Sequence, residues 1–180
     1  MITINFYPES DKPEFTKAAL EYSEIWKTDG QKIHQAIESV SGLKFTTKVI
    51  NAVTFEGFSY SIPLRLRSSY TYSHKEATLI HELCHRLMID NYFYIFDTTN
   101  LSEDIHKIID LILFDLWVNI LGEKSANESK DKEISYGEPA YKNAWEWALS
   151  FDKDARKTKF NELTAKYSNH PKAQARVGQH

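Results

Sequence analysis

The chain has 180 residues, of which 42% are hydrophobic and 26% are charged, and its formal net charge is −3. These values are ordinary for one globular domain with a substantial core, so we expect a single domain over residues 1–180 with a frayed tail over residues 169–180. The small negative charge gives no indication of a nucleic-acid partner. The single cysteine excludes an internal disulfide and a four-cysteine zinc ribbon.

Targeting and membrane signals are missing from the sequence. No apolar run reaches the roughly 20 residues of a membrane-spanning helix, and the N-terminus lacks the basic start and apolar centre of a signal peptide. The single cysteine also suits a reducing compartment. The sequence therefore predicts a cytoplasmic protein that makes no membrane contact.

The first third of the chain has the pattern of short strands around one long helix. Asp29 and Gly30 are candidates for an interruption of this helix, and Gly42 is its expected end. The predicted strands are residues 2–6, 43–58 (one or two strands) and 62–67, and the predicted helix is residues 13–40. We therefore expect a small mixed or antiparallel sheet with a helix ahead of the rest of the chain.

A His-Glu-x-x-His motif, formed by His81, Glu82 and His85, lies in a stretch with the apolar pattern of a helix. Residues four apart share one helix face, so both imidazoles can bind one cation. Glu82 lies close enough round the same turn to reach a water on that cation. Ser73 and Glu76 have the spacing of a capping box, which predicts that the helix begins at Ser73. This arrangement is typical of a zinc hydrolase.

A second helix is predicted over residues 102–122, which are apolar nearly all round, with Ser102 as its N-cap. A buried helix should not carry ionisable groups without partners, yet His106 and Asp110 lie four apart on one face. Catalytic zinc usually has three protein ligands and one open position. His106 is the only histidine on this helix, so the predicted zinc ligands are the two motif histidines and His106.

The rest of the chain is predicted to be a loop followed by two helices. Residues 123–135 are polar and charged, as in a surface loop, and helical patterns return over residues 139–151 and 154–167. We therefore predict an α+β fold in which the motif helix packs on the central buried helix. The small sheet precedes these two helices, and the C-terminal helices follow them.

Residues 43–122 resemble the zincin metallopeptidases, and their motif spacing is most similar to the thermolysin-like gluzincins. In that family a glutamate on the next helix is the third zinc ligand, and an aspartate one turn later supports the first histidine of the motif. His106 follows His85 at a similar distance, and Asp110 lies one turn further on. The resemblance implies one zinc ion per chain, with His106 as third ligand and Asp110 accepting the far N–H of His81. Histidine in place of the usual glutamate sets the chain apart from the gluzincins proper.

The resemblance also implies a peptidase mechanism. Zinc would acidify a bound water, and Glu82 would take its proton and deliver it to the leaving amine. A further donor would stabilise the oxyanion. Zincins often supply a tyrosine or histidine from the later part of the chain, and Tyr136 is the first candidate here, with Tyr141 and Tyr70 as competitors.

The zincin resemblance further implies an edge strand ahead of the motif helix, with which an extended peptide pairs. The residues in this place are Leu64, Arg65, Leu66 and Arg67. Arg65 and Arg67 either favour acidic residues or a terminal carboxylate in the substrate, or are solvated charges that protect the edge from aggregation. The predicted partner is therefore a peptide or protein substrate.

Two other functions stay open on the sequence. SprT-like proteases also carry His-Glu-x-x-His, although no basic DNA-binding tail or zinc ribbon is present here. A catalytically silent metal-binding module for regulation or interaction would keep the fold, but Glu82 argues against it because a structural site needs no general base. The small size leaves room for a narrow regulatory target or for a partner protein that completes the cleft.

Overall fold

The computed structural model describes residues 1–95 and 98–168, and the predicted frayed tail lies outside them. Within these residues the architecture is α+β, with one three-stranded sheet and six helices. The first half contains β1 (Thr3–Pro8), α1 (Pro13–Ser41), β2 (Val49–Phe55), β3 (Leu64–Arg67) and α2 (Tyr72–Asp90). The second half contains α3 (Leu101–Leu121), α4 (Glu123–Ile134), α5 (Pro139–Leu149) and α6 (Lys153–Ser168).

The three strands run parallel in the order β1-β2-β3, so the expected mixed or antiparallel sheet is wrong. α1 carries the chain back between β1 and β2, and such a crossover makes two strands parallel. Between β2 and β3 the chain returns through residues 56–63, where Tyr60 forms an antiparallel bridge with Arg65 of β3. We call residues 58–62 the edge segment. The antiparallel neighbour of β3 is therefore this short segment and not a full strand.

α1 runs without interruption through Asp29 and Gly30. Gly30 is buried, and a Cβ atom there would lie 2.7 Å from Cδ2 of Trp26, so glycine leaves room for the indole. Gly42 follows the helix with a φ of 72°, a left-handed conformation that glycine adopts without strain. The predicted end of the helix at Gly42 is confirmed.

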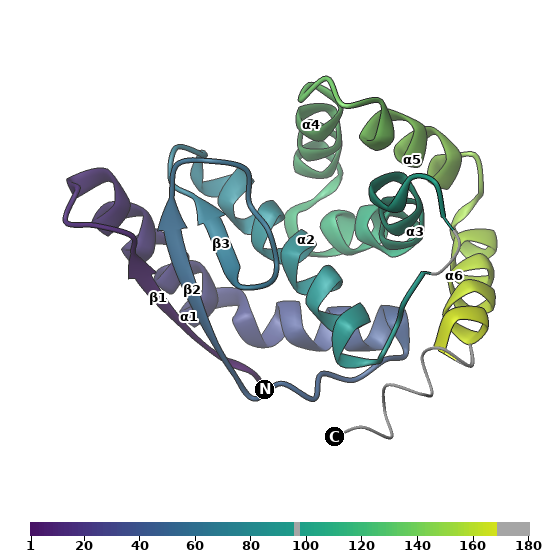
Figure 1. Cartoon of the computed structure of the whole chain (residues 1–180), viewed down its shortest axis with the longest axis horizontal. Coiled ribbons are helices and arrows are strands. Elements are labelled where there is room, and N and C mark those ends of the chain that lie inside the picture. Colours follow the sequence, from purple (N-terminus) through teal and green to yellow (C-terminus); the bar gives the residue numbers. More distant parts are fainter. Residues whose placement is uncertain (96–97, 169–180) are drawn as a thin grey trace.

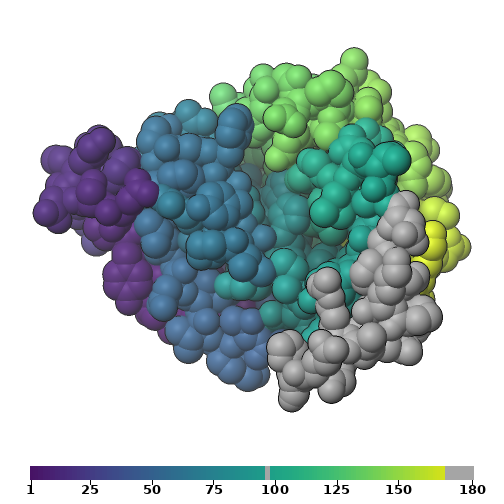
Figure 2. All heavy atoms as spheres, viewed as in Figure 1, coloured from purple at the N-terminus to yellow at the C-terminus, as the bar shows by residue number. Residues whose placement is uncertain are grey.

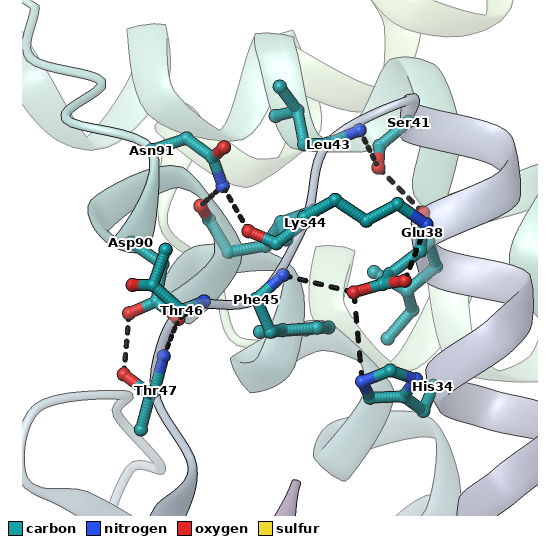
Figure 3. A network of polar contacts seen from close by, with 12 residues as sticks. His34, Glu38, Ser41, Leu43, Lys44, Phe45, Thr46, Thr47, Asp90 and Asn91 are labelled. Atoms are coloured by element: carbon teal, nitrogen blue, oxygen red, sulfur yellow. Dashed lines mark hydrogen bonds and ion pairs between the residues drawn. The ribbon is translucent and has the colours of Figure 1, made fainter. Parts of the chain in front are cut away.

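A polar network fixes the connection from α1 to β2 (Figure 3). Glu38, near the end of α1, accepts hydrogen bonds from the Lys44 ammonium at 2.7 Å and from the Phe45 N–H at 3.1 Å. Asp90, the last residue of α2, accepts from the Thr47 N–H at 2.8 Å and from its hydroxyl at 2.6 Å. The network ties the start of β2 to the ends of both helices and so holds the sheet against α2.

Both helices that carry the predicted metal ligands begin slightly earlier than expected. Thr71 rather than Ser73 caps α2, and its side chain accepts the N–H of His74. Asn100 rather than Ser102 caps α3. Threonine and asparagine are established N-cap residues as well, so residue type alone does not fix where a helix begins.

α4 occupies residues for which a surface loop was expected, and that expectation is wrong. Its buried positions are Ala126, Ser129 and Glu133, which keep helical spacing but include only one apolar side chain. Hydrophobic periodicity therefore gives almost no signal for this helix. Such a helix is stabilised by what it packs against rather than by its own pattern.

α2 lies at the centre of the fold, between the sheet and the C-terminal helices (Figure 1). It packs on α1 and β3 on one side and on α3 and α4 on the other. In the space-filling view a hollow separates the blue atoms of the strand side from the teal and green atoms of the helical side (Figure 2). The motif helix is therefore placed where the two sides of the molecule face each other.

α3 is the central apolar helix, as predicted. It contacts α1, α2, α4, α5 and α6, and its side chains Ile109, Ile112, Leu113 and Leu116 are fully buried. Even so, neither α3 nor any other helix within residues 1–95 and 98–168 is long and apolar enough to cross a membrane.

Candidate metal centre

Three histidine side chains converge where α2 and α3 meet. His81 and His85 lie one turn apart on α2 with stacked rings, whose centroids are 4.9 Å apart. The His106 ring, from α3, stands edge-on to both, with centroids 5.3 Å from His81 and 5.0 Å from His85. One ligand nitrogen from each ring lies within 4.8 Å of the other two. The fold thus brings together the three histidines that the sequence indicated.

Hydrogen bonds orient two of the three rings. Nδ1 of His81 lies 2.5 Å from Oε1 of Glu133, and Nδ1 of His106 lies 2.6 Å from the backbone carbonyl oxygen of Ser102. Both oxygens accept, so each Nδ1 carries the proton and Nε2 is the nitrogen that remains for a metal. An acceptor oxygen behind the imidazole is the usual support for a histidine that binds metal.

The nitrogen spacing and the donor set fit zinc. Nε2 of His81 and Nε2 of His85 are 3.0 Å apart. Two nitrogen lone pairs at this distance repel unless a proton or a cation lies between them. Nitrogen ligands at about 2.0–2.1 Å from a tetrahedral zinc lie roughly 3.3–3.4 Å apart, so only a small adjustment is needed. Three imidazoles with one open position are a known donor set for catalytic zinc.

Burial and charge act differently on the three rings. Burial lowers the pKa of His81, but the adjacent Glu133 carboxylate outweighs this effect, and the pKa rises to about 9. Burial lowers the pKa of His106 to about 4, and the charge of His81 adds to the shift. Burial also lowers the pKa of His85 well below its ordinary value. Two of the rings are therefore neutral at pH 7, which is the form that binds metal.

Glu133 is the carboxylate that supports His81, and the expectation that Asp110 does so is wrong. Nδ1 of His81 has a single proton to donate, and Glu133 accepts it. The second oxygen of Glu133 accepts the indole N–H of Trp145, on α5, at 2.9 Å. Both oxygens of this buried carboxylate thus bind N–H donors, which offsets the cost of burying its charge.

Asp110 lies close to the same cluster without a protein partner. Its side chain is fully buried, and neither carboxylate oxygen has a hydrogen-bond partner among the described residues. Burial raises the pKa of Asp110 well above its ordinary value, and the nearby charge of Glu133 raises it further. Burial therefore favours the protonated, uncharged form of Asp110.

Glu82 faces a cavity of about 30 Å³, which holds about one or two water molecules. Burial raises the pKa of Glu82, His81 opposes the shift and Glu133 adds to it, so that the pKa is about 7. A carboxyl group with this pKa can accept and return a proton near neutral pH. The other residues that line the cavity are Phe58, Ser59, Tyr70, Thr78, His81, Glu133, Tyr136 and Tyr141.

Three of the lining residues are the tyrosines considered as oxyanion donors, and the structure distinguishes them. The hydroxyls of Tyr70 and Tyr136 are hydrogen-bonded to each other. The Tyr141 ring lies against the His106 ring, with centroids 4.5 Å apart. Within the described part of the chain, the Tyr141 hydroxyl has no hydrogen-bond partner. Tyr141 is therefore free to donate beside the histidines, whereas Tyr136 is engaged.

The predicted edge strand Leu64–Arg67 is present as β3, but the edge segment covers its outer edge. The N–H and the carbonyl of Arg65 pair with Tyr60 at 2.9 and 3.0 Å. The N–H of Arg67 donates to the Ser59 hydroxyl at 3.0 Å. The outward backbone groups of β3 are thus already bonded, so an added peptide finds no free edge there.

The two arginines of β3 are bonded within the chain as well. The Arg65 guanidinium binds the Glu9 carboxylate and lies 4.1 Å from the centroid of the Phe55 ring. Nε of Arg67 donates to the Glu56 carboxylate at 2.7 Å. Both positive charges are therefore paired inside the molecule.

Sequence reasoning missed Glu133 and Trp145, which complete the support of His81. The helical spacing of Ala126, Ser129 and Glu133 was the available signal, but it is carried by polar residues. The indole donor gave no signal, because a tryptophan at helical spacing indicates core packing.

Comparisons of the chain with models of protein families, with curated proteins and with solved structures gave no match. The geometry of the cluster is therefore the basis for any function. That geometry consists of three convergent histidines, their supporting oxygens, and Glu82 beside a small cavity.

Proposed function

We propose that the protein is a zinc-dependent peptidase of zincin type, with Glu82 as its general base. The observation that supports this most strongly is the convergence of His81, His85 and His106 within 4.8 Å, beside a cavity that Glu82 lines. A structural zinc site closes its fourth position with another protein ligand. Here a proton acceptor, Glu82, and space for water lie beside His81, as hydrolysis requires.

The side chains around the cluster have separate tasks in this proposal. Zinc held by the three histidines would supply Lewis acidity, which activates water and polarises a carbonyl. Glu82 accepts the proton of the attacking water and delivers it to the leaving amine, so that the carboxylate is restored. Glu133 holds His81 in the tautomer that presents Nε2.

Tyr141 is the side chain that we assign as oxyanion donor. Its ring lies 4.5 Å from His106, and its hydroxyl is not engaged by any described residue. A preorganised donor of this kind stabilises the negative charge that develops on the carbonyl oxygen during attack. Tyr136 is the weaker choice because its hydroxyl is bonded to Tyr70.

An extended peptide would pair with the edge segment and not with β3. Tyr60 turns its backbone groups toward β3, and residues 61–63 form a turn, so strand addition would be confined to residues 58–60. The side chains of Phe58, Tyr60 and Ile62 are 62%, 40% and 47% exposed and offer apolar contacts. Strand addition of this kind draws affinity from main-chain bonds and specificity from side chains.

Hydrolysis of a broad peptide library by the zinc-loaded protein tests the proposal. Wild type should cleave, and Glu82→Gln should bind zinc with unchanged affinity but lose cleavage. Glu146→Gln, at an exposed position of α5, is the matched control and should behave as wild type. A protein that binds zinc and cleaves nothing in the library would favour the silent binding module instead.

A further inference from the structure

A pair of tyrosine hydroxyls bridges the cleft beside Glu82. Tyr70 follows β3 and Tyr136 follows α4, so their hydrogen bond joins the strand side of the molecule to the helical side. Both rings line the cavity that Glu82 faces. Phe58, from the edge segment, also contacts Tyr136 edge-on, with ring centroids 5.6 Å apart. Tyr136 thus makes both contacts across the cleft, one with Tyr70 and one with Phe58.

The bridged cavity is too small for a peptide. Its volume is about 30 Å³, whereas pockets for small ligands measure roughly 300–1,000 Å³. A peptide bond that approaches Glu82 and the histidines therefore requires one wall of the cavity to move. The hydrogen bond between the two tyrosines is the contact that such a movement must break.

The strand side of this pair is the firmly held one. The carbonyl of Tyr70 accepts a hydrogen bond from the Lys75 ammonium at 2.6 Å. Lys75 is buried and pairs with Glu21, on α1, at 2.8 Å. Arg67 adds a contact from β3, with its guanidinium 5.3 Å from the centroid of the Tyr70 ring. Tyr70 is thus fixed by α1, α2 and β3 together.

On the helical side, the described contacts of Tyr136 come from the two helices that flank its own turn: its ring centroid lies 6.2 Å from that of Tyr141, on α5, and 5.9 Å from the ammonium of Lys132, on α4. Tyr136 lies in the turn between α4 and α5, and its neighbours Ser135, Gly137 and Glu138 are exposed. Gly137 has a φ of 77°, in the region that glycine enters without strain. We call residues 135–138 the hinge turn. Its movement would withdraw Tyr136 from Tyr70 and Phe58 and leave the zinc ligands in place.

We propose that the hydrogen bond between Tyr70 and Tyr136 is a latch that keeps the cleft closed until the hinge turn moves and admits a peptide. The statement that the open cleft binds a peptide rests on the proposed peptidase function. The latch itself rests on the contacts of the two tyrosines.

Amide hydrogen exchange measures how often the hinge turn opens, and it needs no substrate. Tyr70→Phe and Tyr136→Phe each remove one hydroxyl and keep both rings. Loss of one neutral hydrogen bond changes an opening equilibrium by about 2- to 10-fold, so amide exchange in the hinge turn should be faster by that factor in each variant. The double variant should be no faster than either single variant, because both remove the same bond. Tyr7→Phe, at an exposed position of β1, is the control and should not change the exchange.

A second measurement, the cleavage of casein (an unfolded protein), tests the peptidase proposal separately from the latch. We expect Tyr70→Phe to raise kcat/KM by the same factor as exchange. Unchanged exchange in Tyr70→Phe or Tyr136→Phe overturns the latch, whatever the activity. Slower cleavage by Tyr70→Phe despite faster exchange overturns the claim that opening admits the substrate. Faster exchange while no form cleaves casein supports the latch and counts against the peptidase.

Discussion

Glu133 accepts the Nδ1 proton of His81 at 2.5 Å, although the two residues are 52 positions apart in the chain. This bond joins α4 to the motif helix and fixes which nitrogen of His81 faces the other two histidines. Trp145, on α5, donates to the second oxygen of the same carboxylate. The candidate metal centre is therefore assembled from α2, α3, α4 and α5 and depends on the packing of all four.

Zinc affinity should depend on Glu133 and hardly at all on Asp110. Glutamine at position 133 offers one acceptor oxygen and an N–H₂ group to two N–H donors, so His81 or Trp145 loses its partner. We expect Glu133→Gln to weaken zinc binding by about 10- to 100-fold. Asp110→Asn keeps the shape of a side chain whose oxygens bind no described partner, and it should leave the affinity nearly unchanged. Competition titration against a chromogenic chelator measures both, and equal losses in the two variants would contradict the assignment.

Removal of the Tyr141 hydroxyl should slow turnover without affecting the metal. We expect Tyr141→Phe to lower kcat by about 100-fold at unchanged KM, because an oxyanion donor acts on the transition state and not on the bound substrate. Steady-state kinetics on a cleaved peptide, with zinc content measured in parallel, checks this. A comparable fall in kcat for Tyr136→Phe but not for Tyr141→Phe would transfer the role to Tyr136.

Glu76 should make stability fall as pH rises. Burial and the charge of Asp29 raise the pKa of Glu76 from 4.5 to about 7, although Lys32 opposes the shift. Between these two pH values the folded chain binds more protons than the unfolded chain, so the free energy of unfolding decreases with pH through this window. Glu76→Gln should therefore have a higher Tm than wild type at pH 8 and an equal Tm at pH 4.

Differential scanning fluorimetry at the two pH values checks the prediction for Glu76. Glu24→Gln, an exposed position on α1, is the matched control and should show no pH-dependent gain. A gain for Glu76→Gln of the same size at both pH values would mean that its carboxyl titrates normally in the folded protein.

Gly30→Ala should destabilise the fold even though alanine is the better helix former. The new Cβ would lie 2.7 Å from Cδ2 of Trp26. Overpacking costs about 1–3 kcal/mol, and the gain in helix propensity is about 1 kcal/mol. We expect a net loss of about 1 kcal/mol in the free energy of unfolding, measured by urea denaturation. Trp26→Phe should remove part of the effect in the double variant, since the two side chains share one contact.

The three histidines could be found from the sequence because local rules place them. Helical periodicity puts His81 and His85 on one face of α2, and it puts His106 on a buried face of α3. Both helices were predicted, with errors of only one or two residues at their starts. The regions of the strands before the motif were predicted as well, but not the direction in which they pair. The direction of β3 relative to β2 depends on the path of residues 56–63, which the sequence pattern does not encode.

The support of His81 could not be found from the sequence, because it depends on a contact between distant helices. Glu133 lies on α4, a helix without an apolar stripe, and its position becomes meaningful only when α4 packs on α2. Asp110 was predicted as the partner from the family resemblance, in which the supporting aspartate lies one turn after the third ligand, here His106. The prediction therefore placed a carboxylate correctly beside the histidines, but the acceptor of the His81 proton is Glu133 and not Asp110.

The most direct test of the metal centre is the zinc content of the purified protein and of two histidine variants after exposure to zinc and removal of the excess. We predict one zinc per chain in wild type and in His34→Ala, whose ring stacks on Phe45 away from the cluster. His106→Ala should retain little zinc, because it lacks one of the three converging nitrogens. Zinc retained in full by His106→Ala, or no zinc bound by wild type, would contradict a three-histidine centre.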